Sequence, residues 1–220
     1  MSKCRISLLQ TCLLALFLCV TAQASFADPV HDAARKGNMA KLQELAKANP
    51  SAVSTVDKMG RTPLHMAAEG YQLTAATFLL EHGADVNAKD RNGGFTALDL
   101  ALSSYHYIEM VRLLIDHGAN VNTASTQGVT PLMEAAMRNQ KDAIALLLEK
   151  GADPNARDEK GNTALLWALM MGRLDSATVL INSGADVNLP NGQGVTPMKV
   201  AKMRQDSKLL KLLQGKGARD

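Results

Sequence analysis

The chain has few cysteines and few aromatic side chains, and the positions of the cysteines exclude several kinds of site. Its 220 residues include three cysteines, and aromatic residues make up 4% of the chain. Cys4, Cys12 and Cys19 all lie before Asp28, so the segment 28–220 contains no thiol. That part of the chain can form no disulfide, no thiolate metal site and no cysteine nucleophile, and its stability must come from packing.

The chain also lacks a large excess of charge of either sign. It contains 24 Lys and Arg against 21 Asp and Glu, a formal charge of +3. Lys3 and Arg5 lie before Asp28, so residues 28–220 contain 22 basic and 21 acidic residues, a net charge of +1. A near-neutral chain gives no general argument for nucleic acid or an anionic membrane as a partner, and we expect no nucleic acid.

The segment 1–27 has the pattern of a cleavable secretory signal peptide. Lys3 and Arg5 precede a mainly apolar run from Ile6 to Val20, and small residues allow cleavage after Ala24 or Ala27. This run is shorter than the roughly 20 residues that a membrane-spanning helix needs. An uncleaved anchor is therefore the less favoured alternative, and we expect no stable membrane insertion after cleavage.

Two further observations bear on the destination of the chain. Lipid attachment at Cys19 is disfavoured, because Leu18 stands where a signal resembling the bacterial lipoprotein type has a small residue. The one N-x-S/T triplet is Asn49-Pro50-Ser51, which its proline blocks for glycosylation. We expect the periplasm as the location, with secretion as the second choice.

A pattern with a period of about 33 residues repeats through the rest of the chain. The segment 62–68 reads TPLHMAA, in which Thr62 can cap a helix and Pro63 suits the first helical position. The same start recurs with this period at Thr96, Thr130, Thr163 and Thr196.

A second signal repeats with the same period. The segment 83–87 reads GADVN, and Gly83 can end a helix because glycine enters the left-handed conformation at little cost. Further Gly-Ala pairs begin at Gly118, Gly151, Gly184 and Gly217. A fixed period of this length predicts a solenoid of short helix pairs.

The segment 62–67 matches the pattern T-P-L-H-x-A, so residues 28–220 resemble the ankyrin-repeat family in five aligned copies. The resemblance implies an all-α solenoid of helix-turn-helix units with short β-hairpin-like finger turns. We expect one domain at 28–220. Its units are an N-terminal cap repeat at 28–56, internal repeats at 57–89, 90–124, 125–156 and 157–188, and a C-terminal cap repeat at 189–220.

The repeat at 90–124 departs from the period at two places. The finger at 93–95 is one residue longer than its equivalents, and the segment 105–107 adds one residue between the two helices. Insertions in such repeats map to loops, so Phe95, Tyr105 and Tyr107 are candidates for a binding hot spot. The alternative is that Phe95 folds back onto a finger and the tyrosines fill the groove.

The repeat pattern also predicts the surroundings of two other aromatic residues, Tyr71 and Trp167. Tyr71 occupies the turn between helices where the family usually has glycine, so either its backbone is strained or the first helix is longer. Trp167 falls where a first helix faces its neighbour, and we expect it in the core rather than in a ligand platform.

No motif for catalysis or phosphate binding occurs. The five histidines are spread over three repeats, and repeated positions lie far apart along a solenoid, so these side chains cannot converge as a catalytic triad. The motifs H-E-x-x-H and G-x-S-x-G are absent. A copper site of thioethers is disfavoured because nothing fixes three methionines at ligand spacing. We expect no enzyme, no catalytic residue, no cofactor and no metal. In this family the His65 position usually bonds the backbone of the next repeat.

Ankyrin proteins commonly hold partners with finger turns and first-helix ends, so the resemblance implies partner-binding roles here. The finger residues with an implied partner-binding role are Lys58, Met59, Arg61, Arg91, Asn92, Phe95, Thr126, Gln127, Val129, Glu159, Lys160 and Asn162. The residues with such a role at the first-helix ends and in the insertion are Glu69, Ser103, Ser104, Tyr105, Tyr107, Met137, Arg138, Met170 and Met171.

These features predict a non-enzymatic protein-interaction module, monomeric alone, that acts as a periplasmic adaptor or stabilising partner of another protein. The chain resembles small exported bacterial ankyrin-repeat proteins, one class of which supports periplasmic catalase and resistance to peroxide. The alternative is a secreted effector or toxin-neutralising protein that binds a foreign target.

Overall fold

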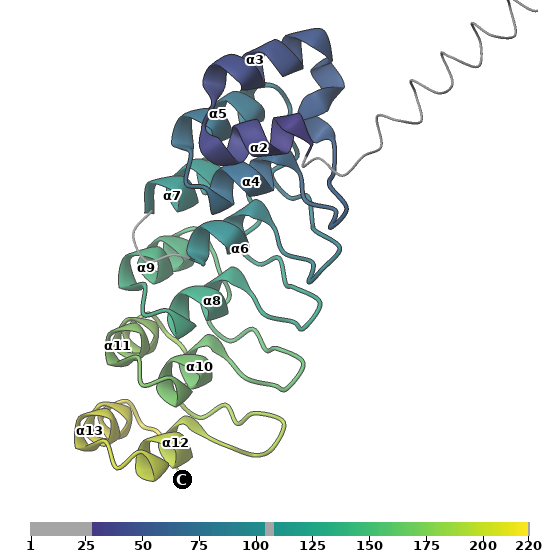
Figure 1. Cartoon of the computed structure of the whole chain (residues 1–220). Helices are drawn as coiled ribbons and strands as arrows, with labels where there is room; N and C mark the ends of the chain where they lie inside the picture. The colour runs from purple at the N-terminus through teal and green to yellow at the C-terminus, as the bar shows by residue number, and fades with distance from the viewer. Residues whose placement is uncertain (1–27, 104–107, 220) are drawn as a thin grey trace, which may run out of the picture.

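The chain forms a linear stack of helix pairs. The computed structural model describes residues 28–103 and 108–219, so the predicted leader at 1–27 and Ser104, Tyr105 and Tyr107 lie outside the described residues. The second helices of the pairs form one side of the stack, and finger loops project from the opposite side (Figure 1). Helices pack mainly on their own partners and on those of the adjacent pairs, as in a repeat solenoid.

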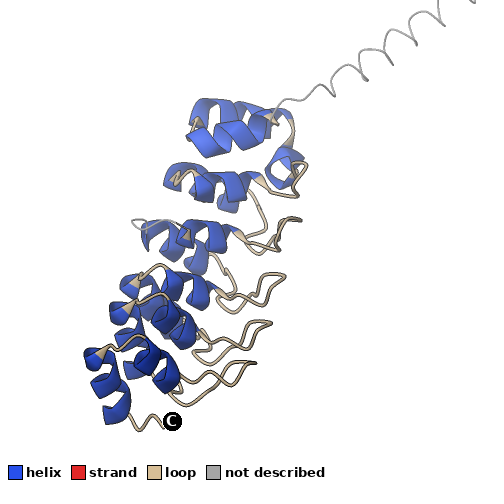
Figure 2. Ribbon diagram, turned by 60° about the horizontal axis from the view of Figure 1, so that its bottom comes forward, coloured by secondary structure: helices blue, strands red, loops and turns tan. Residues whose placement is uncertain are grey.

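In the described part of the chain the α-helices form six pairs. The first helices are α2 (Pro29–Lys36), α4 (Pro63–Glu69), α6 (Ala97–Leu102), α8 (Pro131–Met137), α10 (Ala164–Met170) and α12 (Pro197–Met203). The second helices are α3 (Met39–Ala48), α5 (Leu73–Glu81), α7 (Ile108–Asp116), α9 (Lys141–Glu149), α11 (Leu174–Asn182) and α13 (Ser207–Gly215). A short 3-10 helix, η2 (Pro50–Ser54), follows α3, and no strand occurs among the described residues (Figure 2). The predicted all-α solenoid is confirmed.

The repeated threonines begin the first helices, as their sequence positions predict. The side chain of Thr62 accepts the backbone N–H of His65, and Pro63 occupies the first turn of α4. The threonine hydroxyl therefore satisfies a backbone donor that the helix itself leaves unpaired. The same cap forms at Thr96, Thr130, Thr163 and Thr196.

Asparagines join neighbouring repeats at the loops that follow the second helices. Asn122 Nδ2 donates to the carbonyl oxygen of Gly151 at 3.0 Å, and Asn122 Oδ1 accepts the N–H of Asp153 at 2.9 Å. Asn87 makes the equivalent pair of bonds one repeat earlier. Asn188 makes the equivalent pair of bonds to the last repeat, where its Oδ1 accepts the N–H of Arg219 at 2.7 Å. Each of these side chains ties one repeat to the next.

The fingers also contact one another through their backbones. Within a finger, the N–H of Asp57 donates to the carbonyl oxygen of Arg61, four residues on. In the longer finger the N–H of Asp90 reaches Phe95, five residues on, which confirms the one-residue insertion. Between fingers, the N–H of Arg91 donates to the carbonyl oxygen of Met59 at 2.8 Å.

The core runs without interruption through the stack. On the first helices it contains Leu64, Leu98, Leu132, Leu165 and Met198, none more than 3% exposed. On the second helices it contains Leu79, Leu114, Leu147, Leu180 and Leu213, all 0% exposed. The described residues therefore bury a complete hydrophobic core of their own.

The turn between the two helices of a pair uses a left-handed residue. Tyr71 has φ of 55° and α4 ends at Glu69, so the strained backbone is the correct alternative and the longer first helix is not. Gly172 (φ 69°) fills this position in a later repeat, and Gln205 (φ 52°) fills it in the last.

Candidate partner-binding surface

The fingertips present polar and apolar side chains to solvent. The carboxylate of Asp57 shapes the first one, because its Oδ1 accepts the N–H groups of Met59 (2.8 Å) and Arg61 (2.9 Å). The two residues that follow Asp57, and those at the same positions in the next three fingers, are exposed at the fingertips. The exposed fingertip residues are Lys58, Met59, Arg91, Asn92, Thr126, Gln127, Glu159 and Lys160.

Arg61 links a finger to the end of its first helix. Its Nε and Nη2 each lie 2.9 Å from Asp57 Oδ2, and its Nη1 lies 3.8 Å from Glu69 Oε2. Partial burial acts to raise the pKa of Asp57, but the hydrogen bonds and positive charge of Arg61 outweigh it and lower that pKa. Two of the predicted contact residues, Arg61 and Glu69, thus form one electrostatic group.

The first helices of the last three repeats end in methionines at equivalent positions. Met137, Met170 and Met203 each lie seven residues after the capping threonine, and we call them the methionine row. Met137 and Met170 are half-buried, whereas Met203 is 74% exposed. Met171, next to the row, is 48% exposed. Met203 is not among the predicted contact residues, although its spacing from Thr196 marks it as the equivalent of Met170.

Arginines of the following repeats hold this row in place. Arg173 Nε donates to the carbonyl oxygen of Met137 at 2.9 Å, and Arg204 Nη1 donates to that of Met170 at 3.2 Å. Beside the row, Arg138 Nε donates to Glu134 Oε1 at 2.7 Å. Apolar thioethers therefore alternate with fixed positive groups along the first-helix ends.

Three of the predicted contact positions are buried or partly buried and make contacts within the repeat stack. Asn162 is 4% exposed, donates to Asp158 Oδ2 at 3.1 Å and accepts Asn191 Nδ2 at 2.9 Å, so it ties fingers together instead of facing a partner. Val129 is half-buried and packs on the core. Ser103 is half-buried, and its hydroxyl donates to the carbonyl oxygen of Leu100 at 2.7 Å.

Phe95 combines the two expected placements, because its ring folds back onto its own finger and also remains partly exposed. Its ring lies directly over Gly93 of its own finger, since a Cβ at Gly93 would meet the ring atoms. The side chain is nevertheless 36% exposed. The predicted tyrosine neighbours, Tyr105 and Tyr107, lie outside the described residues.

We group the remaining predicted positions that the structure describes with Met203 and call this set the contact strip. It consists of the eight exposed fingertip residues together with Arg61, Glu69, Phe95, Met137, Arg138, Met170, Met171 and Met203.

Three interior polar or aromatic groups have partners within the stack. His65 Nε2 donates to the carbonyl oxygen of Phe95 at 3.0 Å, which confirms the expected bond to the next repeat. Asp99 occupies the same position one repeat later and accepts the N–H and hydroxyl of Thr96 at 2.8 Å. Burial raises the pKa of Asp99 to about 6. The half-buried Trp167 packs on the core and donates from Nε1 to Asp158 Oδ2 at 2.9 Å.

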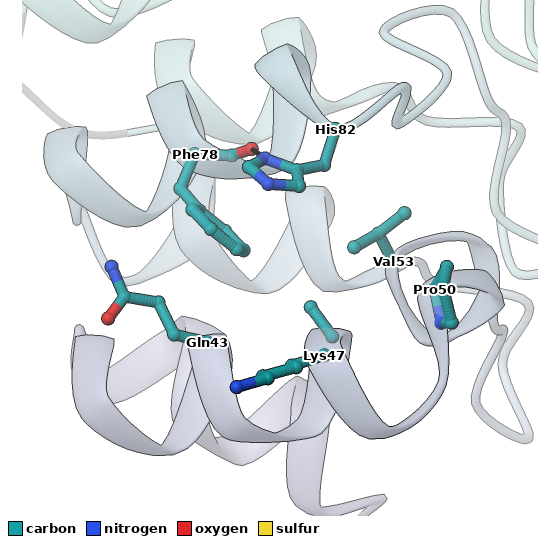
Figure 3. Close-up of a pocket in the computed structure, with 7 residues that line it drawn as sticks. Gln43, Lys47, Pro50, Val53, Phe78 and His82 are labelled. Carbon is teal, nitrogen blue, oxygen red and sulfur yellow. Dashed lines mark hydrogen bonds between the residues drawn. The ribbon is translucent and has the colours of Figure 1, made fainter.

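A separate hollow lies between α3 and α5, on the side of the second helices (Figure 3). It has a volume of about 400 Å³ and adjoins a second hollow of about 410 Å³. The Phe78 ring lines both hollows and stacks on His82 with the ring centres 3.9 Å apart. Pro50 and Val53 of η2 form one end, so the hollow exists where η2 replaces the usual loop. Its lining residues are Gln43, Ala46, Lys47, Pro50, Val53, Phe78 and His82, a mainly apolar set without a convergent polar cluster.

These features define a helical repeat protein with a long exposed contact surface. Among the described residues, no three His, Cys, Asp or Glu side chains are grouped so that they could hold a metal ion. No helix in the same residues has the length and apolar character needed to cross a membrane. A family model described as ankyrin repeats matches the chain in three copies, at residues 30–125, 89–158 and 123–191. The chain belongs to the ankyrin-repeat family, a non-enzymatic fold whose repeats mediate protein–protein interaction.

Known proteins agree with this assignment. A crystal structure of an ankyrin repeat domain from Acinetobacter baumannii superposes with a TM-score of 0.80 at 30% identity, covering 87% of this chain and 98% of that one. Inversin from Gallus gallus is 34% identical over 52% of this chain, and ankyrin repeat domain-containing protein 13B from Mus musculus is 29% identical over 52%. The chain spans 10% and 18% of the lengths of these two relatives.

Proposed function

We propose that this chain is an exported adaptor that binds a protein partner along the contact strip. The observation that supports this most is the exposure of Met203 in the methionine row, at 74%, and of Met171 beside the row, at 48%. Covering such side chains with a partner is favourable, and flexible thioethers adapt to the shape of the surface that covers them. The chain is monomeric until it meets that partner.

The location and the partner form the finer part of the proposal. The signal-like pattern of residues 1–27 favours export to the periplasm. By analogy with the small exported bacterial proteins that the sequence resembles, a periplasmic catalase is the first partner to test, and the role is to stabilise it under peroxide stress.

The experiment captures partners of the tagged full-length chain separately from periplasm and from culture medium. Met171→Lys with Met203→Lys places two charges in the strip, whereas Ala145→Lys places one on the exposed outer side of α9. We expect capture from periplasm that falls about tenfold or more with the strip variant and is unchanged with Ala145→Lys. Equal capture by all three proteins would contradict the strip, and recovery from the medium alone would contradict the periplasmic role. Mass spectrometry of the captured protein tests the catalase assignment.

A further inference from the structure

The end of the stack formed by α12 and α13 differs in charge from the rest of the molecule. Residues 189–220 contain seven basic and two acidic residues, a net charge of +5. Residues 28–188 contain 15 basic and 19 acidic residues, a net charge of −4. The near-zero total therefore conceals a strongly dipolar molecule.

All seven basic side chains are exposed, and we call them the basic end. Within residues 189–219 the one acidic residue is Asp206, whose Oδ1 accepts the N–H groups of Lys208 and Leu209 as the cap of α13. The basic end consists of Lys199, Lys202, Arg204, Lys208, Lys211, Lys216 and Arg219.

The need to cap a solenoid does not account for this charge. A terminal repeat requires a polar outer face, and charges of both signs provide one. The N-terminal repeat at 28–56 does so with four basic and three acidic residues. Two ion pairs form there, Lys36 with Asp32 at 2.9 Å and Lys41 with Glu44 at 2.8 Å. The two ends of the stack thus meet the same requirement in different ways.

Two of the basic side chains, Lys199 and Lys202, lie on the face that an internal repeat would cover. Lys199 and Lys202 occupy the positions in α12 that Leu166 and Leu169 occupy in α10, where they are 0% and 1% exposed. No described helix pair packs beyond α12 and α13 (Figure 1), so these lysines point out of the end of the stack. Met203 adds an exposed apolar side chain at the edge of the same face.

Helix α13 contributes two further basic side chains to the last repeat. Leu209 and Leu213 are buried at 2% and 0% exposure, whereas Lys208 and Lys211 are exposed on the opposite side. Basic residues beside partly exposed apolar ones, spread over two adjacent helices, are typical of surfaces that adsorb to anionic lipid. We propose that the basic end binds the surface of an anionic phospholipid bilayer.

Contact through the end of the stack has a consequence for the contact strip. The fingers and the first-helix ends run along the length of the stack, so a molecule held to a bilayer by its last repeat leaves most of them free. Adsorption requires no spanning segment, and it does not depend on which protein the strip binds. The adaptor would then hold its partner beside a membrane.

The test uses residues 28–220, which bury a complete core, and vesicles of phosphatidylcholine with or without phosphatidylglycerol. We expect binding to the anionic vesicles only, and loss of that binding at high salt. Lys208→Glu with Lys211→Glu should weaken it about tenfold or more. Lys36→Glu with Lys41→Glu makes the same change in net charge at the opposite end and should change it less than about threefold. Circular dichroism melting of both variants checks that each remains folded.

Three outcomes would overturn the proposal. Failure of the wild-type protein to bind anionic vesicles at low salt, or equal binding to neutral vesicles, would contradict a role for lipid charge. Equal losses of vesicle binding in the two folded double variants would show that binding depends on the net charge of the protein and not on the basic end. Binding to soluble polyglutamate but not to vesicles would replace the bilayer with an acidic protein surface.

Discussion

His65 of one repeat and Phe95 of the next are joined by a hydrogen bond from a buried imidazole to a finger backbone. His65 Nε2 donates to the carbonyl oxygen of Phe95 at 3.0 Å, while Nδ1 accepts the N–H of Thr62 at 3.1 Å. Burial lowers the pKa of His65, which keeps the ring neutral and able to accept one bond and donate the other. A single side chain thus fixes the start of α4 and couples it to the following repeat.

Replacing this side chain should destabilise the whole stack. His65→Leu removes both bonds and leaves the buried N–H of Thr62 without its partner, so we expect a loss of about 2–4 kcal/mol in the free energy of unfolding. His82→Ala is the control, because His82 is exposed and bonds only to the carbonyl oxygen of Phe78 in its own repeat. It should cost less than about 1 kcal/mol in urea denaturation. Equal losses would contradict the coupling role of His65.

The carboxyl of Asp99 should make stability depend on pH. Its folded pKa is raised to about 6 from 3.8, so the folded state holds the proton more tightly and stability falls as pH rises from about 4 to 6. Asp99→Asn keeps an oxygen for Thr96 without the buried charge and should be more stable at pH 7 by up to about 3 kcal/mol. The difference should vanish near pH 4.

Melting temperatures of wild type and Asp99→Asn across this range provide the measurement. His65 acts in the opposite direction, because its lowered pKa makes protonation destabilising as pH falls below 6.5. Comparing the two proteins at each pH cancels that contribution. Asp142→Asn on the exposed face of α9 should leave the profile unchanged. A constant difference between wild type and Asp99→Asn at all pH values would count against a buried ionised carboxyl.

The asparagine junctions should control how cooperatively the stack unfolds. Asn122→Ala removes two bonds between adjacent repeats, and we expect a loss of about 1–2 kcal/mol with a broader urea transition, because repeats couple only to their neighbours. Asn182→Ala, on the exposed end of α11, should change stability by less than about 0.5 kcal/mol. An unchanged transition for Asn122→Ala would show that the junction bond has no net effect.

The left-handed turn in the last repeat should accept glycine. Gln205 is exposed with φ of 52°, so Gln205→Gly relieves backbone strain and should raise stability by about 0.5–1 kcal/mol. Gly172→Gln is the reverse test, since a Cβ there would meet the guanidinium of Arg204 as well as the strained backbone. Calorimetry should give melting temperatures that move in opposite directions. A lower melting temperature for Gln205→Gly would contradict this account.

The helix starts and the finger lengths could be predicted, because they depend on residues close together in the sequence. A threonine cap needs only an N–H three residues on, so Thr62 and its repeats marked the helix starts. The longer finger at Asp90 was likewise visible as one extra residue before Phe95, although the position of the ring over Gly93 was not.

Contacts between repeats were harder to predict, because their partners lie a full repeat away in the chain. The recurring asparagines were visible, but the sequence alone did not identify the bonds of Asn122 to Gly151 and Asp153. The finger position of Asn162 predicts a solvent-facing side chain, but its bond to Asn191 of the following repeat buries it.

Photo-cross-linking in living cells tests the central claim most directly. A cross-linking amino acid is placed singly at Met59, Glu159, Met171 and Met203 in the contact strip, and at Ala145 and Asp142 on the outer side of α9. We predict that the four strip positions capture one and the same protein and that the two outer positions do not. Capture from the α9 positions alone, or different proteins from each strip position, would contradict a single partner bound along the strip.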